Sequence, residues 1–233
     1  MDDDIDAAGR RIAHVLRERI ITGEIDMGAK LGERDIAEEL GVSRVPVREA
    51  LHVLEAEGFV SSAHRRAAVV HRFTVDDARE LFDMRMQLEP FAAALAAGRA
   101  AEGADTTALR AALEVAHVDA VAEASASSRN SDLHDEIFAL AGHALLSRMS
   151  GLLTGRTRWL FRLTPERDTV GRWDEHAEMV EAIVGGHVML AQTLAAAHVE
   201  RARVESMPGL IERLPVAGPP VRRRRTRRVV SGV

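Results

Sequence analysis

Four residues in the second half of the chain have the types and the spacing of a metal site. Asn130 and His134 are four positions apart, so in a helix they project from the same face. His176 and His198 would lie on two helices joined at residues 185–186, nine and twelve residues from that turn. At 1.5 Å per residue these distances are about 14 and 18 Å. The two imidazoles should therefore sit at similar heights across a hairpin.

Three imidazoles and one amide oxygen that converge inside a helical bundle would bind a divalent ion. Zinc is the preferred ion for such a set of ligands, and nickel or manganese are the alternatives. The bound ion would have room for one added ligand. His187 sits at the turn and His143 lies about 13 Å beyond His134 along the helix rise, so neither should join them. The chain has no cysteine, which removes thiolate ligands and disulfides. The competing interpretation is that these histidines are separate core or surface residues.

A second group of residues could read DNA. Arg44 and Arg48 lie one helical turn apart, near the start of a predicted helix that begins after Ser43, its expected N-cap, and stops at Gly58. The opposite face carries an apolar stripe at helical spacing, formed by Val47, Ala50, Leu51 and Leu54. A short helix over residues 33–40 precedes it, so the pair reads as a helix-turn-helix. An ordinary amphipathic hairpin with a solvated charged face is the alternative.

The elements that must position these residues are mainly helical. The pattern predicts a first helix over residues 7–22 and two short strands between residues 59 and 70, with His64, Arg65 and Arg66 at their tip. Six further helices are predicted at about residues 74–101, 105–124, 128–141, 144–162, 172–185 and 187–206, without a strand pattern among them, which indicates an antiparallel all-α bundle. Prolines from Pro208 onward are expected to end the folded part.

Length and charge fit two domains with different partners. The 233 residues exceed one typical domain, and the net charge is −5. Residues 7–74 carry 11 Lys+Arg against 10 Asp+Glu and residues 75–214 carry 14 against 22, whereas a basic tail with six arginines follows. Nucleic-acid affinity must therefore come from a few local arginines. The Met-Asp-Asp-Asp start and the lack of a long apolar run favour a cytoplasmic protein without a membrane span.

Residues 20–28, 31–51 and 54–60 resemble the DNA-binding module of the GntR-type bacterial transcription regulators. The resemblance covers about residues 8–72 and implies a winged helix-turn-helix domain over residues 1–72 with a small β-wing. It implies DNA contacts from the residues that match the family's reading positions, namely Arg34, Ser43, Arg44, Val45 and Arg48, and from the wing residues His64, Arg65 and Arg66. Val45 stands where the family commonly has threonine, and Ala67 where the wing turn commonly has glycine.

Residues 84–96, 130–146, 175–183 and 197–198 are similar to the FCD ligand-binding domain of the FadR subfamily, and the six-helix count resembles its VanR-like branch. The resemblance spans residues 75–206 and implies an effector, metal and dimerisation domain. It implies that Asn130, His134, His176 and His198 bind the metal, with Asn130 where aspartate is usual. It also implies a small carboxylate effector, with Arg85 as its partner, although a plain ion pair between Arg85 and Glu89 explains that arginine equally well.

These observations predict a homodimeric, ligand-responsive transcription regulator, usually a repressor in this family, which binds a near-palindromic double-stranded operator. Residues 207–233 would form a basic, disordered tail that adds sequence-independent DNA affinity. A metal-dependent hydrolase is one rival, but no His-Glu-x-x-His helix or nucleophile motif is present, so no enzyme activity is expected. A regulator whose metal is purely structural is the other.

Overall fold

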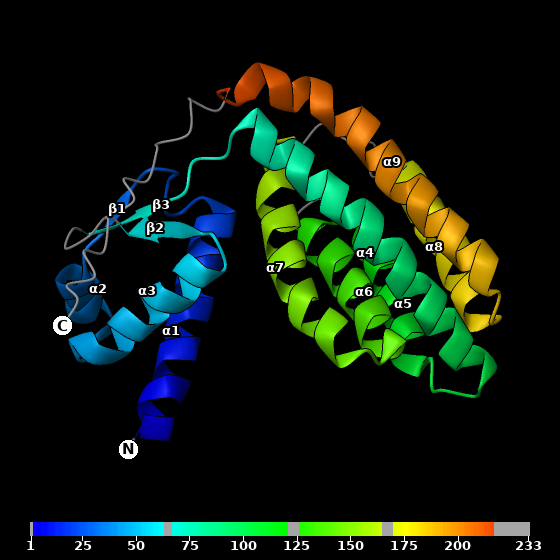
Figure 1. Ribbon diagram of the computed structural model, residues 1–233, viewed down its shortest axis with the longest axis horizontal. Coiled ribbons are helices and arrows are strands. Elements are labelled where there is room, and N and C mark those ends of the chain that lie inside the picture. Colours follow the sequence, from blue (N-terminus) through cyan, green and yellow to red (C-terminus); the bar gives the residue numbers. More distant parts are fainter. Residues whose placement is uncertain (1, 63–66, 121–125, 165–169, 217–233) are drawn as a thin grey trace, which may run out of the picture.

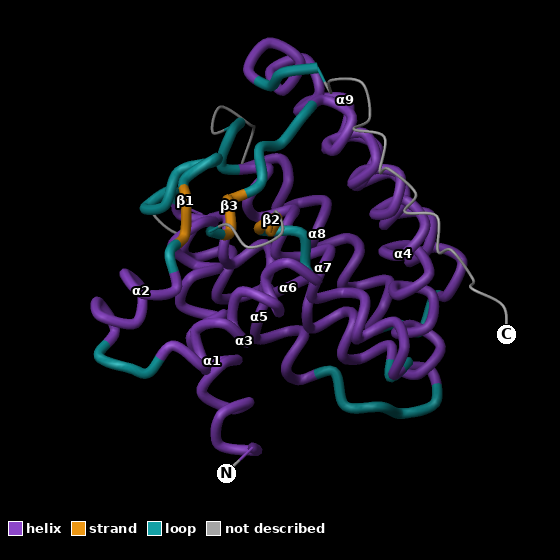
Figure 2. Tube along the Cα trace, turned by 60° about the vertical axis from the view of Figure 1, so that its left-hand side comes forward, coloured by secondary structure: helices purple, strands orange, loops and turns teal. Residues whose placement is uncertain are grey.

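The computed structural model describes residues 2–62, 67–120, 126–164 and 170–216, which form two groups of elements joined by a short linker (Figure 1). The first group contains three helices and three short strands: α1 (Asp2–Thr22), β1 (Lys30–Leu31), α2 (Glu33–Leu40), α3 (Arg44–Ala56), β2 (Val60–Ser62) and β3 (Ala68–Val70). The strands form one antiparallel sheet in the order β1-β3-β2, as Figure 2 shows. This is the predicted winged helix-turn-helix.

The core of this domain follows from two apolar stripes. Leu16 and Ile20 of α1 and Val47 and Leu54 of α3 are completely buried, so the two helices pack face to face. Between α2 and α3 the chain turns at Gly41, whose φ of 63° lies in the left-handed region that glycine adopts without strain. The turn leaves the N-terminal end of α3 and its arginines on the surface.

The second group is a bundle of six helices: α4 (Val75–Ala101), α5 (Thr107–Ala120), α6 (Ala126–Ala141), α7 (Ala144–Phe161), α8 (Val170–Val184) and α9 (Val188–Arg213). Helix α4 begins with a capping box, in which Thr74 and Asp77 each bond the other's backbone N–H. Helices α4 and α9 run antiparallel along most of their length (Figure 1). No helix in the described part of the chain is long and apolar enough to cross a membrane.

Helix α7 joins the two groups. The Trp159 indole is completely buried and stacks on Phe59 with ring centroids 5.3 Å apart, and it meets Phe73 edge-on at 4.6 Å. Next to it, Arg158 makes two hydrogen bonds of 2.8 Å to the carboxylate of Glu18 on α1. The winged-helix domain is therefore packed against the bundle through both aromatic and charged contacts.

The structure corrects the predicted end of the folded chain. Helix α9 continues through Pro208 to Arg213, although the sequence predicted an end at residue 206. Leu210, within these seven extra residues, and Leu214, directly after them, are buried, and the Pro215 carbonyl accepts a hydrogen bond from Val75 N–H. This burial offsets the hydrogen bond that proline removes. Strand β1 and the start of α1 at Asp2 were not predicted, and the arginine-rich run of residues 222–228 lies outside the described residues.

We expect Leu210→Ala to lower the free energy of unfolding by about 2–4 kcal/mol, because it leaves a cavity at a completely buried position. The neighbouring Ile211 is 52% exposed, so Ile211→Ala should cost no more than about 0.5 kcal/mol. Urea unfolding of both variants measures the difference. Equal costs would show that residues 207–214 do not belong to the folded core.

Candidate nucleic-acid interface and metal centre

The N-terminal end of α3 presents the two predicted reading arginines to solvent. The side chain of Arg44 is 62% exposed and that of Arg48 is 50% exposed, one helical turn later. Ser43 occupies the predicted N-cap position, but its side chain makes no capping hydrogen bond. Val45 is 49% exposed on the same end of the helix. These four residues thus form a surface at the end of the helix that a major groove could receive.

Both arginines bind one carboxylate. Glu33, the first residue of α2, accepts hydrogen bonds from Arg48 Nε and Nη2 at 2.9 Å and from Arg44 Nη2 at 3.0 Å. The hydrogen bonds from Arg48, opposed by partial burial and reinforced by Arg44, lower the pKa of Glu33 to about 2. The Glu33 carboxylate is therefore ionised throughout the neutral pH range.

The other predicted DNA contacts are less well defined. Arg34 lies on α2 and makes an exposed i, i+4 ion pair with Glu38 at 2.9 Å. An exposed pair of this kind contributes little to stability, so Arg34 can leave it at little cost. His64, Arg65 and Arg66 lie outside the described residues.

The bundle brings three of the predicted metal ligands together. His134 on α6, His176 on α8 and His198 on α9 are all buried, and one ring nitrogen from each lies within 4.8 Å of the others. The ring centroids of His176 and His198 are 4.4 Å apart, and each lies 5.4 Å from that of His134. The interpretation of these histidines as separate residues is therefore wrong. His143 and His187 are exposed and take no part in this cluster.

Two carboxylates lie behind the cluster. Glu89 lies 3.2 Å from His134 Nδ1, and Glu175 lies 3.0 Å from His198 Nδ1. A carboxylate at Nδ1 favours the tautomer with the proton on that nitrogen, which leaves the lone pair on Nε2. Metal-binding histidines in proteins are commonly held in this way. Glu175 is also paired with Arg201 at 2.8 Å.

Arg85 is buried beside this arrangement. Its Nε donates to Glu89 at 2.6 Å and its Nη2 at 3.2 Å, so the expected i, i+4 ion pair is present. Burial would raise the pKa of Glu89, but the charge of Arg85 and contact with His134 hold it well below its usual range. The guanidinium lies over the rings of Phe82 and Phe161. Its Nη1 is buried and has no hydrogen-bond partner among the described residues.

The residues present fit a bound metal ion. His134 Nε2 is buried without a hydrogen-bond partner in the described part of the chain. Such an unsatisfied nitrogen costs about 1–3 kcal/mol, a cost that a bond to a metal would remove. The donor set of three imidazole nitrogens suits zinc and other divalent transition metals. Asn130 lies one turn before His134 on α6, but its side chain lies outside the described part of the structure.

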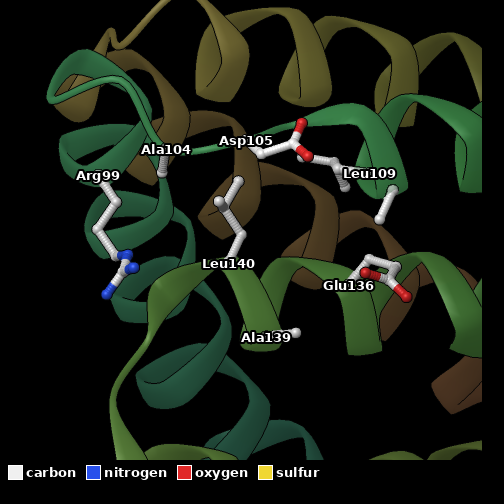
Figure 3. Close-up of a pocket in the computed structure, with 8 residues that line it drawn as sticks. Arg99, Ala104, Asp105, Leu109, Glu136, Ala139 and Leu140 are labelled. Atoms are coloured by element: carbon white, nitrogen blue, oxygen red, sulfur yellow. The ribbon is translucent and has the colours of Figure 1, made fainter.

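A surface pocket lies elsewhere in the bundle. It has a volume of about 270 Å³ and is lined by Arg99, Asp105 and Glu136, among others (Figure 3). None of the three clustered histidines lines it. Arg99 is fourteen residues beyond Arg85 on α4, which is about 21 Å along the helix axis. This pocket is therefore separate from the histidine cluster.

Sequence reasoning missed three acidic partners in these sites. Glu33 contacts arginines that follow it by 11 and 15 residues, but the turn at Gly41 places them on a different helix, so helical spacing does not relate these positions. Glu89 was predicted only as the partner of Arg85, and no part in the metal site was predicted for Glu175. Their contacts to histidines join different helices, so only the packing of the bundle could reveal them.

The fold and these sites define a class of protein, namely a DNA-binding regulator in which a winged helix is joined to a helical domain. The sequence model described as "Bacterial regulatory proteins, gntR family" matches residues 8–70, and that of the FCD domain matches residues 80–201. The chain belongs to the GntR family and carries a C-terminal FCD domain. This family is one of bacterial regulatory proteins.

Individual relatives agree with this assignment. An uncharacterised HTH-type regulator from Streptomyces ambofaciens is 32% identical over 215 residues, which cover 82% of this chain and 84% of that protein. The gluconate operon transcriptional repressor of Bacillus subtilis is 44% identical over 85 residues, but these cover only 36% of this chain and 35% of that protein. A solved structure of a candidate GntR regulator from a Rhodococcus species has the same fold, with a TM-score of 0.74, 24% identity, and coverage of 87% of this chain and 98% of that one.

We expect the Glu33 carboxyl to remain ionised in the folded protein at pH 4, where a carboxyl with the ordinary value of 4.5 would be mostly protonated. The hydrogen bonds from Arg48 cause this shift, so Arg48→Gln should move the titration midpoint upward. Carboxyl carbon chemical shifts followed by NMR measure both midpoints. A wild-type midpoint near 4.5 would contradict the ion pair seen here.

Proposed function

We propose that the protein is a homodimeric, ligand-responsive transcription regulator, a repressor, that binds a near-palindromic double-stranded operator. It would sense a small carboxylate through a metal centre in its FCD domain. The observation that carries this proposal is the joining of a helix end bearing two arginines to a bundle with three converging buried histidines. A DNA partner also implies a cytoplasmic location.

The DNA-binding part of the proposal rests on α3. Its exposed N-terminal end would enter the major groove, with Arg44 and Arg48 within reach of base edges and phosphates. Arg34 on the preceding helix, together with Ser43 and Val45, would add contacts at the edge of the interface. The wing residues His64, Arg65 and Arg66 remain part of this proposal by resemblance to the family.

In the metal centre, His134, His176 and His198 would be the ligands, and Asn130 would supply a fourth oxygen. Zinc fits this set, and nickel or manganese are alternatives. A divalent ion held there would supply an open position to which a carboxylate oxygen can bind. Glu89 and Glu175 would orient two of the three imidazoles through Nδ1.

Arg85 would pair with the effector carboxylate. Its buried Nη1 lacks a hydrogen-bond partner in the described structure, while its Nε and Nη2 each donate to Glu89. A guanidinium held in this way still has both N–H groups of Nη1 to offer to an anion. The Bacillus subtilis relative is named as the transcriptional repressor of a gluconate operon, and gluconate is a carboxylate. The alignment covers about a third of that protein, so the effector class rests on Arg85 and the histidines.

Helix α7 would carry the signal between the two sites. On one side Thr154 donates a 2.9 Å hydrogen bond to Asp135, the residue that follows His134. On the other side Trp159 and Arg158 contact the DNA-binding domain. Effector binding must favour one arrangement of these contacts over another in order to change operator affinity. The six helices α4–α9 support the VanR-like branch, with the domain extended from residue 206 to residue 214.

The proposed dimer would use the face between α4 and α7. This face exposes Met84, Phe91, Met149 and Leu152, each at least 36% exposed. A groove of about 270 Å³ between the two helices is lined by several of these side chains. Contiguous apolar surface of this kind is typical of a protein contact, and a second copy would place two α3 helices on an operator with two-fold symmetry.

His176→Ala should remove the metal, because it deletes a completely buried ligand of the three-histidine cluster. Mass spectrometry of the purified protein should find about one divalent ion per wild-type chain and close to none in the variant. The exposed His187, varied to alanine, is the matched control. Equal metal content in wild type and His176→Ala would overturn the metal centre.

If metal is bound but a panel of small carboxylates gives no thermal stabilisation, the metal is purely structural.

Changing Arg44 and Arg48 together to alanine should abolish footprint protection of the operator at moderate salt. Two charged contacts to bases or phosphates are lost, and each bidentate contact to a base contributes about 1–3 kcal/mol of discrimination. The wild-type footprint should contain two half-sites, as a dimer requires. Arg79→Ala, which removes an exposed arginine of α4, is the control and should leave the footprint intact. Unchanged protection by the double variant would refute the proposed interface.

A further inference from the structure

One carboxylate sits between the two reading arginines. Glu33 lies on α2 and accepts three hydrogen bonds from side chains of α3. These bonds connect the two helices of the helix-turn-helix. Its side chain is 27% exposed, which means that it is at the surface that would face DNA. An acid at such a position is unfavourable for binding a polyanion. Its effect on recognition therefore needs an explanation.

The two arginines contact Glu33 with different numbers of N–H donors. Arg48 uses Nε and Nη2, which form one complete edge of its guanidinium, to bind Glu33. Arg44 gives Glu33 only one Nη2 proton. A guanidinium has five N–H donors in a fixed plane, so Arg44 retains a two-donor edge after the contact. Arg48 is held rigidly and Arg44 is oriented beside it.

We infer that Glu33 is a positioning residue that raises the sequence specificity of DNA binding by fixing Arg48 and by aiming Arg44 at a guanine. This inference rests on the proposed function. The two acceptors of a guanine, O6 and N7, match the remaining edge of Arg44. A phosphate can also accept from this edge, but its negative charge is repelled by Glu33, whereas the guanine edge is neutral. Binding to random DNA is carried mainly by phosphates, whereas the correct operator also places a guanine edge in register with Arg44.

The test compares two DNA duplexes of equal length. One is selected by the full-length wild-type protein from a random pool, and the other has random sequence. Glu33→Gln keeps the shape of the side chain and removes its charge. Because the arginines become free to bind phosphates, affinity for the random duplex should rise and affinity for the selected duplex should not. The ratio of the two affinities should fall about tenfold, as measured by fluorescence anisotropy.

The salt dependence supplies a second readout. Binding of the variant to random DNA should depend more steeply on salt, by up to about 0.9 in the log–log slope for each new phosphate contact. The matched control is Glu39→Gln on the same helix, which removes the same charge from an ion pair with Arg19. Glu33→Asp keeps the charge and should preserve most of the specificity ratio. Thermal unfolding of each variant verifies that the fold is intact.

A double-mutant comparison separates positioning from simple charge. In an Arg44→Gln background, Glu33→Gln should change the ratio much less than it does in the wild type, because the side chain that Glu33 aims at the guanine is absent. The same fold-change in both backgrounds would overturn the inference, as would a ratio unchanged by Glu33→Gln or lowered equally by Glu39→Gln. If the wild-type protein selects no duplex, the proposed function itself fails, which is a different result.

Discussion

Trp159 holds the DNA-binding domain against the helical bundle. Its indole contacts Phe59, which follows α3, and Phe73, which precedes α4. One ring therefore contacts both ends of the segment that contains β2 and β3. Each aromatic pair contributes about 0.5–1.5 kcal/mol beyond the burial of its area. The close approach depends on Gly155, since a Cβ there would lie 3.2 Å from the Phe59 ring. The position of α3 relative to the histidine cluster is thus set by packing along α7.

The interior of the bundle is unusual in what it buries. Three imidazoles, a guanidinium and a carboxylate lie within a core that is otherwise aliphatic and aromatic. Buried charges are costly unless they are paired, and the ion pair between Arg85 and Glu89 meets this requirement. The pair is in turn linked to His134 through Glu89. A fold that only needed stability could fill this space with apolar side chains, so the polar groups indicate a site.

Much of this organisation could be predicted from the sequence. Apart from the C-terminal end of α9, helix spacing located α2, α3 and the six bundle helices to within a few residues, and counting from the turn at residues 185–186 placed His176 and His198 at the same height. Helical periodicity is a local property, which is why these predictions succeeded. The end of α9 was wrong because proline is a local signal, whereas the burial of Leu210 depends on α4 and its surroundings. The roles of Glu33, Glu89 and Glu175 depend on contacts between helices, which no spacing encodes.

The segment between the sheet and α4 has a mechanical consequence. Only residues 71–74 separate β3 from α4, and both ends of this segment are fixed. His71 N–H bonds the Phe59 carbonyl and its ring contacts Asp77, while Thr74 closes the capping box. A chain so short and so well anchored has none of the freedom of a flexible tether. In the proposed mechanism, a small rotation of α4 or α7 would therefore turn the winged helix as a unit and displace the far end of α3 more than the end next to the bundle.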